Sequence, residues 1–549
     1  MNDFGSGLFF VPLGGTGEIG MNLNAYALDG TFLAVDCGMG FADPDTPEAD
    51  VLVADASFFA ERRERLAGLV ITHAHEDHIG GIAWHWRALQ CPIFATAFAA
   101  TLIRFRLAEA GLLNKVKIHE FSPGSTFEAG PFRLRSIRMA HSTPEAVALA
   151  IETRYGTVLH TGDWKIDPEP LVGSPTDEAA LREVGDSGVL AMVSDSTNAL
   201  VEGHSGSEAT VRKSLIALIA GLKGRVAVTC FASNVARIAS VIEAARHSGR
   251  RVALIGRSLG RYVEAAQTCG YLREVADFVP EDQVGKISDD RLLILVTGSQ
   301  GEKRSALARI AADTHRSIAF GDGDTVIFSS RVIPGNERAI GRVQDDLVRA
   351  GVRVMTEADH MVHVSGHPAR DDLRRLYKLV RPRYLIPTHG ERRHLAAQAE
   401  LAEAEQITTI MLEDGDVVEL GPGKAGIVDS VPTGRLAVDG ERLVQLQGGL
   451  MAARRRMLSS GIVIGSIAVD KGGVLRGAPK IAAPGLFEPD DPVLDSYAVK
   501  LADNFVALPA HIRRDADLLV PAAEAILRRL LGRRLGKHPL INMQIISVK

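Results

Sequence analysis

With 549 residues and a hydrophobic content of 46%, the chain is long enough for about two to four domains that each bury a core. The net charge of −5 excludes a protein that is basic overall, although phosphate binding depends on local potential. The four cysteines lack CxxC spacing, and no apolar run has the length of a signal peptide or membrane span. We therefore expect a protein of the reducing cytoplasm that binds no membrane.

The N-terminal part of the chain has the pattern of short strands. Asn24–Leu28 and Thr31–Asp36 flank Asp29-Gly30, which predicts a hairpin. Gly15, Gly17 and Gly20 satisfy GxGxxG, but this hairpin follows them where a nucleotide-binding loop requires a helix, so we expect a tight turn beside the active site. Later strands are predicted at Leu69–Thr72, Val147–Thr153, Thr157–His160 and Val189–Val193.

Between about residues 208 and 350 the pattern changes to alternating strands and helices. Segments of helical period, such as Val235–Ala245, separate the apolar runs Val226–Cys230, Val252–Ile255, Leu292–Val296 and Val326–Phe328. This alternation predicts βαβ units, a parallel sheet and a separate α/β domain. Tyr384–Pro387 then predicts another buried strand, and the helical period around Val520–Leu531 indicates a third, small domain.

The segment Thr72–His78 follows a predicted strand and has the composition of a metal site. Residues two apart in an extended segment point the same way, so His73 and His75 can bind one ion. Where a helix begins, Asp77 and His78 turn toward a second ion. Zinc suits this mixture of imidazole and carboxylate, while an exposed polar helix start is the alternative interpretation.

Three further candidate ligands follow other predicted strands. They are His141, Asp163 in His160–Trp164, and His389 in Pro387–Glu391. Each alone also fits an ordinary turn, helix cap or loop histidine. Together with Thr72–His78 they form a set of seven candidate ligands.

These residues carry a resemblance to a known family. His73–His78, His141 and Asp163 match successive motifs of the metallo-β-lactamase fold, and Ser194–Asn198 resembles the first motif of its β-CASP group. Further segments are similar to ribonuclease J: Leu13–Gly20, Phe231–Asn234, Thr297–Glu302, Ile333–Asn336, His363–His367 and Pro387–Glu391.

The resemblance implies a fold and domain order of the α/β class. An αββα metallo-β-lactamase sandwich is expected over residues 1–205 and 361–448, with a β-CASP α/β domain inserted at 206–360. A linker and a small C-terminal α/β domain are expected at 449–549.

The same resemblance implies two zinc ions, with manganese or magnesium as alternatives in the cell. One ion is assigned to His73, His75, His141 and Asp163, and the other to Asp77, His78, Asp163 and His389. Asp36 is expected to orient ligands without binding metal. A calcium ion near Asp50 and Asp439 is a further implication.

Roles in catalysis and substrate binding are also implied. His367 is expected to protonate the leaving 3′-oxygen, and Asp77 and Asp195 are also assigned catalytic roles. The substrate-binding residues are expected to be Ser233, Asn234, Val235, His363, Val364, Ser365, Gly366 and His367. Backbone N–H groups at a helix start suit a terminal 5′-phosphate, with an ordinary N-cap as the alternative.

The resulting hypothesis is a two-zinc ribonuclease. We expect 5′→3′ exonuclease activity on single-stranded RNA with a 5′-monophosphate, together with endonuclease activity, in RNA decay and in rRNA and mRNA processing. The family forms homodimers and homotetramers and has partners in RNA-degradation complexes. The alternatives are a β-CASP nuclease that cuts DNA, a small-molecule metallo-hydrolase, and a non-catalytic RNA-binding scaffold. Arginine clusters such as Arg454–Arg456 fit either RNA or partner binding, or a solvated helix face.

Overall fold

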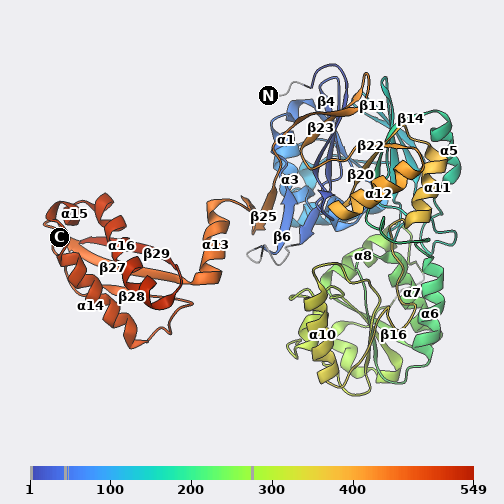
Figure 1. The fold of residues 1–549 in the computed structure, drawn as a ribbon. Helices are drawn as coiled ribbons and strands as arrows, with labels where there is room; N and C mark the ends of the chain where they lie inside the picture. Colours follow the sequence, from blue (N-terminus) through green and yellow to red (C-terminus); the bar gives the residue numbers. More distant parts are fainter. Residues whose placement is uncertain (1–3, 42–45, 47–48, 274–276, 549) are drawn as a thin grey trace. The chain divides into compact units, whose positions relative to one another are not determined.

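The computed structural model describes residues 4–41, 46, 49–273 and 277–548, and it divides into two compact units (Figure 1). Unit 1 comprises Met1–Pro44 and Val51–Leu436, and unit 2 comprises Asp45–Asp50 and Ala437–Lys549. Each unit has its own hydrophobic core, so the two are described separately.

Unit 1 contains two large sheets that face each other. The first has the strand order β24-β23-β1-β3-β4-β7-β8-β9. Its strands are β1 (Leu8–Gly14), β3 (Leu23–Leu28), β4 (Thr31–Val35), β7 (Leu66–Val70), β8 (Ile93–Ala95), β9 (Ile118–Glu120), β23 (Asp416–Gly421) and β24 (Gly426–Ser430). The predicted hairpin is confirmed, because β3 and β4 pair antiparallel across Asp29-Gly30, both with positive φ.

The second sheet has the order β10-β11-β12-β13-β14-β20-β22. Its strands are β10 (Thr126–Ala129), β11 (Phe132–Arg138), β12 (Val147–Thr153), β13 (Gly156–His160), β14 (Val189–Asp195), β20 (Tyr384–Thr388) and β22 (Thr408–Thr409). The strands β13, β14 and β20 run parallel, so their carboxyl ends meet at one edge of the sheet.

A buried apolar layer lies between these sheets and helices cover their outer faces, which confirms the αββα sandwich. The layer includes Phe10 and Tyr26 from the first sheet and Leu149 and Ile386 from the second. A second apolar cluster joins the second sheet to the helices α5 (Glu178–Asp186), α11 (Arg370–Val380) and α12 (Arg392–Ala404). The helices α1 (Ser57–Ala60), α2 (Glu76–Ile79), α3 (Ile82–Leu89) and α4 (Ala97–Glu109) accompany the first sheet.

An inserted domain interrupts the sandwich between β14 and β20 and contains the predicted parallel sheet. The strand order is β16-β17-β15-β18-β19, and every pairing is parallel. The strands are β15 (Val226–Thr229), β16 (Arg251–Ile255), β17 (Leu292–Val296), β18 (Thr325–Phe328) and β19 (Arg353–Met355). Helices flank it: α6 (Glu208–Ala220), α7 (Val235–His247), α8 (Arg257–Thr268), α9 (Ala306–Ala311) and α10 (Glu337–Arg349).

Unit 2 is a small α/β domain, as predicted. Its sheet has the order β28-β27-β29, with β27 (Ile462–Asp470) parallel to β29 (Leu540–Val548) and antiparallel to β28 (Lys480–Ala482). The helices α14 (Pro492–Val506), α15 (Ala510–Arg514) and α16 (Ala516–Leu535) follow β28, and α14 and α16 share an apolar core with the sheet. Along the described chain, no helix combines the length and apolarity needed to cross a membrane.

Several short strands and one helix lie outside the sheets described above. In unit 1, β2 (Thr16–Gly17) pairs with β21 (Gly390–Glu391), and β5 (Met39–Phe41) pairs with β6 (Val51–Ala54). In sequence, β25 (Arg435–Asp439), β26 (Arg442–Gln445) and α13 (Gly449–Ser460) precede β27. The β2–β21 pair places the glycine-rich turn beside His389, whose N–H donates to the carbonyl of Gly15 over 2.7 Å.

Two strands end earlier than predicted, and the site explains why. The backbone of Asp36 has φ 61°, so β4 stops at Val35. The N–H of Thr72 donates to Asp36 Oδ1 over 2.8 Å, where a continuing strand would pair with its neighbour. Both departures aim the following residues toward the strand-end edge of the sandwich.

Candidate metal centre

The segment after β7 changes from extended to helical within a few residues. His75 is extended, with φ −74° and ψ 154°, and α2 begins at Glu76. The rings of His73 and His75 lie with their centroids 4.8 Å apart, whereas Asp77 and His78 belong to the first turn of α2. The local geometry predicted from the spacing is therefore present.

One group of possible ligands combines His73, His75, His141 and Asp163. Their ligand atoms all lie within 4.8 Å of one another. The Nε2 atoms of His73 and His141 lie 3.6 Å and 3.9 Å from Asp163 Oδ2. His141 follows β11 and Asp163 follows β13, so two strands of the second sheet complete a group begun by the first.

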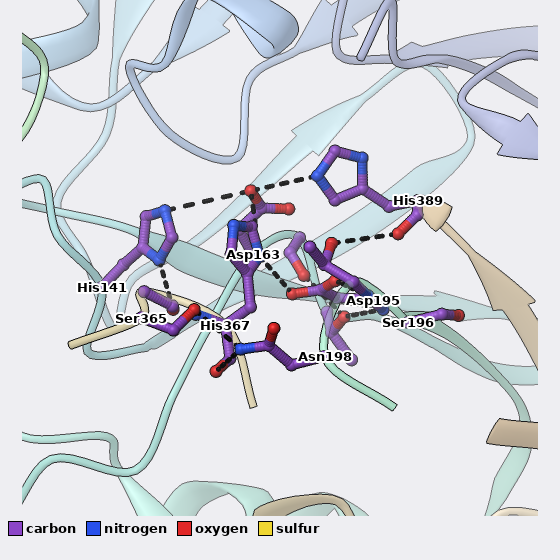
Figure 2. Close-up of polar contacts among 12 residues, drawn as sticks. His141, Asp163, Asp195, Ser196, Asn198, Ser365, His367 and His389 are labelled. Carbon is purple, nitrogen blue, oxygen red and sulfur yellow. Dashed lines mark hydrogen bonds and ion pairs between the residues drawn. The ribbon is translucent and has the colours of Figure 1, made fainter. Parts of the chain in front are cut away.

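A second group combines Asp77, His78, Asp163 and His389, again within 4.8 Å. The Nε2 atoms of His78 and His389 each lie 3.4 Å from Asp163 Oδ2 and 3.6 Å from Asp77 Oδ2. Asp163 belongs to both groups and lies between His141 and His389 (Figure 2).

The unpaired atoms of these residues fit two bound cations. His73 Nε2, His389 Nε2 and both carboxylate oxygens of Asp163 are buried without a hydrogen-bond partner. Buried polar atoms are normally paired, because leaving them unpaired costs free energy. Four ligand atoms at about 2.0–2.2 Å from a tetrahedral zinc lie roughly 3.3–3.6 Å apart, which is close to the separations found here.

Second partners fix the ring orientation of several histidines. His78 Nδ1 donates to Asp36 Oδ2 over 2.7 Å, and Thr72 Oγ1 also donates to this oxygen, over 2.8 Å. His141 Nδ1 donates to the carbonyl of Gly366 over 2.7 Å. Each bond engages Nδ1 and turns Nε2 of the ring toward the other ligand atoms, where His78 Nε2 contacts Asn22 and His141 Nε2 contacts His75. Asp36 lies outside both ligand groups.

Burial and mutual charge set the protonation of the group. Burial lowers the pKa of His75 to about 4, and burial together with neighbouring histidines lowers that of His73 and His141 well below the usual value. Burial alone would raise the pKa of Asp163. The charges of His389 and the other surrounding imidazoles outweigh burial and bring this pKa well below its usual value. In the second group burial lowers the pKa of His78 and His389, but Asp163 and Asp77 raise it above the usual value. Neutral imidazoles and ionised carboxylates are the forms that bind metal.

His367 lies beside the two groups and forms, with Asp163, Asp195 and His389, a third set of possible ligands. Its Nδ1 donates to Asp195 Oδ2 over 2.8 Å and lies 3.8 Å from Asp163 Oδ2 (Figure 2). Burial lowers the pKa of His367, but Asp195 and Asp163 raise it to about 9 overall. Asn198 supports the loop by donating to Ser365 Oγ over 2.7 Å and to the carbonyl of His367 over 3.1 Å.

The start of α7 lies on the inserted domain. Asn234 is the N-cap, and its side chain accepts from the N–H of Arg237 over 2.8 Å. The N–H of Val235 donates to the carbonyl of Ser233, and that of Ala236 donates to the carbonyl of Ser142. These contacts match the N-cap alternative, so a phosphate here would take over backbone donors that already have acceptors.

A buried ionic network connects the inserted domain to the segment 362–367. Arg237 is fully buried, pairs with Glu208 over 2.9 Å, and donates to the carbonyl of Val362 over 3.0 Å. Lys165, just after Asp163, pairs with Asp167 over 3.1 Å, and both side chains are buried. Sequence reasoning missed this network, because nothing in the spacing of these four residues distinguishes them from surface charges.

Two residues that contact the segment Thr72–His78, called the metal loop below, were also missed. The side-chain amide of Asn22 lies 3.2 Å from His78 Nε2 and 3.0 Å from His389 Nδ1. The glycine-rich turn before Asn22 was the available signal for it. Tyr262, from α8 of the inserted domain, donates to the carbonyl of Ala74 over 3.0 Å. It lies within an ordinary amphipathic helix, which gave no signal.

The expected calcium site lies within unit 2. Asp439 accepts from Arg442 over 2.8 Å and from Arg454 over 2.9 Å. Asp50 is exposed. Two guanidinium groups already compensate the charge of Asp439, and the calcium ion stays a prediction. The same contact engages the first arginine of the cluster Arg454–Arg456.

Three family models match successive parts of the chain. A model described as the metallo-β-lactamase superfamily matches residues 24–226, and one described as the ribonuclease J β-CASP domain matches residues 223–347. A third, described as a Zn-dependent metallo-hydrolase RNA specificity domain, matches residues 351–412. The third match includes His363–His367 and His389.

The similarity to two other proteins covers nearly the whole chain. Ribonuclease J of Sinorhizobium meliloti is 41% identical, with 98% of this chain and 97% of that protein aligned. Ribonuclease J of Mycolicibacterium smegmatis is 37% identical, with 99% and 98% aligned. A crystal structure of a protein of unknown function from Enterococcus faecalis covers 75% of this chain and 100% of its own, with a TM-score of 0.53. At 16% identity, this last likeness concerns the fold alone.

Proposed function

This chain belongs to the ribonuclease J family of the metallo-β-lactamase superfamily, and from its site we propose that it is a two-zinc ribonuclease. The finer proposal is a 5′→3′ exonuclease that prefers RNA with a 5′-monophosphate and also cuts internally. Its roles would be RNA decay and the processing of rRNA and mRNA. Assembly as a homodimer or homotetramer, partners in a degradation complex, and the domain limits 205, 360 and 448 belong to the same proposal.

The observation that carries this proposal is the shared carboxylate of Asp163. It is buried, has no hydrogen-bond partner on either oxygen, and has four imidazole nitrogens of the two ligand groups within 3.4–3.9 Å of Oδ2. A carboxylate shared by two cations would account for the unpaired Oδ2, on which the four imidazole nitrogens converge. A scaffold without catalysis gives no reason to keep such a costly arrangement.

The ligands His73, His75, His141 and Asp163 would hold one ion, and Asp77, His78, Asp163 and His389 the other. When bound, the zinc ions supply an ionised water near neutral pH and offset charge on the phosphate. Asp36 and the carbonyl of Gly366 keep the rings of His78 and His141 turned toward the ions. Manganese or magnesium can replace zinc in this role.

His367 is the proton donor for the leaving 3′-oxygen in this proposal. Asp195 accepts from its Nδ1, which leaves Nε2 to face the substrate. Asn198 holds the backbone and side chain of the same loop, and so fixes the distance between His367 and the metal ligands. Ser233 to Val235 and His363 to Gly366 would hold the terminal phosphate.

The test compares substrates that differ only in the 5′ end or in the sugar. Zinc content is measured on the purified protein, and degradation is followed for 5′-monophosphorylated RNA, 5′-triphosphorylated RNA and DNA of the same sequence. We expect bound zinc, faster degradation of the monophosphorylated RNA, and little cleavage of DNA. Equal rates on the two RNAs would remove the 5′-end preference, and equal rates on DNA would favour a DNA nuclease.

A further inference from the structure

Arg331 is an exposed side chain at the mouth of the site. It follows β18 of the inserted domain, and its Nη1 donates to Asn198 Oδ1 over 3.3 Å. Asn198 in turn contacts Ser365 Oγ and the carbonyl of His367. The guanidinium group is therefore separated by a single side chain from the loop that contains His367.

Three cations act on this part of the site, and Arg331 differs from the other two. Burial lowers the pKa of His363, and the charges of Arg237, Arg331 and Lys165 lower it further, to well below the usual value. Arg237 and Lys165 are buried and paired with Glu208 and Asp167. Among the described residues, no carboxylate lies within 4 Å of the Arg331 guanidinium. Its guanidinium group is exposed, with the charge of Glu357 acting on it from beyond contact distance, and is available to a further anion.

The backbone around Arg331 is held on both sides. The buried Gln300 donates through Nε2 to the carbonyl of Arg331 over 2.8 Å and accepts at Oε1 from the N–H of Ile333 over 3.0 Å. Two residues earlier, Ser329 Oγ donates to the carbonyl of Val362 over 2.6 Å. Such anchoring reduces the conformational entropy that a cation loses when it binds a ligand.

We propose that Arg331 binds a phosphate group of the RNA strand at the mouth of the site. The inference rests on the proposed ribonuclease function and adds to it a substrate contact from the inserted domain. The planar guanidinium keeps one edge for Asn198 and presents other N–H groups to phosphate oxygens, an arrangement suited to two-point binding. The phosphate is either the terminal 5′ group or an internal phosphodiester, since both have the same ionised oxygens.

The experiment measures binding of a short single-stranded RNA, labelled at its 3′ end, by fluorescence anisotropy over a range of salt concentrations. The comparison of Arg331→Gln with Arg331 is made on a His78→Ala background, so that the RNA stays intact. Arg331→Lys tests whether charge alone suffices. Arg353→Gln is the matched control, because Arg353 is exposed and begins β19, the neighbour of β18, where the parallel strands start, whereas Arg331 follows the end of β18.

We expect Arg331→Gln to raise Kd by about tenfold, as for loss of a charge-assisted contact. The slope of log Kd against log salt should fall by about 0.7, the contribution of one phosphate contact to a single strand. Arg331→Lys should keep most of the salt slope while losing part of the affinity, and Arg353→Gln should match the background protein. A larger loss with 5′-monophosphate RNA than with 5′-hydroxyl RNA identifies the terminal phosphate, and equal losses identify an internal one.

The proposal is overturned if Arg331→Gln leaves Kd and salt slope within twofold of the background. It is also overturned if Arg353→Gln weakens binding equally, which indicates non-specific attraction. Absence of RNA cleavage by the wild-type protein contradicts the proposed function instead, and it leaves this binding result interpretable by itself.

Discussion

The two halves of unit 1 place opposite chemistry at the ends of their strands. In the sandwich, the segments after β7, β11, β13 and β20 carry imidazoles and two carboxylates, which are groups that could hold cations. In the inserted β-CASP domain, the segments after β15 and β18 carry Ser233, Asn234 and Arg331, which we propose contact the phosphates of the RNA. From this comparison we propose that the sandwich performs the chemical step and that the inserted domain holds the phosphate backbone.

The sandwich and the inserted β-CASP domain are joined by specific contacts. Tyr262 of the β-CASP domain donates to the carbonyl of Ala74, between two metal ligands, and Arg237 donates to the carbonyl of Val362. The separation of chemistry from binding is therefore an approximation, and the following predictions test where it holds.

The largest effect on RNA cleavage is expected from His78→Ala, in the sandwich. The variant removes a ligand of the second group and leaves Asp36 without its imidazole partner. We expect RNA cleavage to fall by about 10³-fold or more while most RNA binding remains. His119→Ala, in the edge strand β9, is the control. Cleavage within tenfold of wild type would contradict the second metal group.

A smaller effect is expected from His367→Ala, in the segment that leads from the inserted domain back to the sandwich. If His367 only donates a proton, the cleavage rate should fall by about 10²-fold with zinc content unchanged. The readouts are single-turnover cleavage and zinc content of the same sample. An unchanged rate removes His367 from the acid role, and a loss of zinc makes it a part of the metal centre.

The smallest effect is expected from Tyr262→Phe, which removes the hydrogen bond from the inserted domain to the carbonyl of Ala74 in the sandwich. Loss of one neutral hydrogen bond of about 1 kcal/mol should weaken zinc binding roughly fivefold at most. Tyr271→Phe is the matched control, since Tyr271 bridges to Glu145 over 3.1 Å and not to the metal loop. If both variants bind zinc like the wild type, the β-CASP domain does not support the metal loop.

The sequence predicted much of this fold because its patterns are local. Asp29-Gly30 between alternating strands specified the hairpin, and the runs around β15 to β18 specified a parallel sheet. Asp163 and His389 meet because the parallel strands β13, β14 and β20 end at a common edge, whereas the other five candidate ligands reach them from β11 and from β7 of the facing sheet. Their roles in catalysis stay predictions.

Most of the contacts that sequence reasoning missed are long-range. Tyr262 and Ala74, or Arg331 and Asn198, are far apart in sequence, and neither pair has a spacing or composition that marks it. Lys165 and Arg237 resemble surface charges until the fold buries them with their carboxylate partners. Such contacts depend on how segments pack in three dimensions. The periodicity of apolar residues along the sequence does not specify this packing.

The central claim, that Asp163 bridges two metal ions, is tested most directly by anomalous X-ray scattering from crystals grown with zinc. The account predicts two anomalous peaks at the zinc edge, about 3.5–4 Å apart, one on either side of the Asp163 carboxylate. The peaks should be flanked by His73 and His141 on one side and by His78 and His389 on the other. A single peak, or zinc bound away from Asp163, would contradict it.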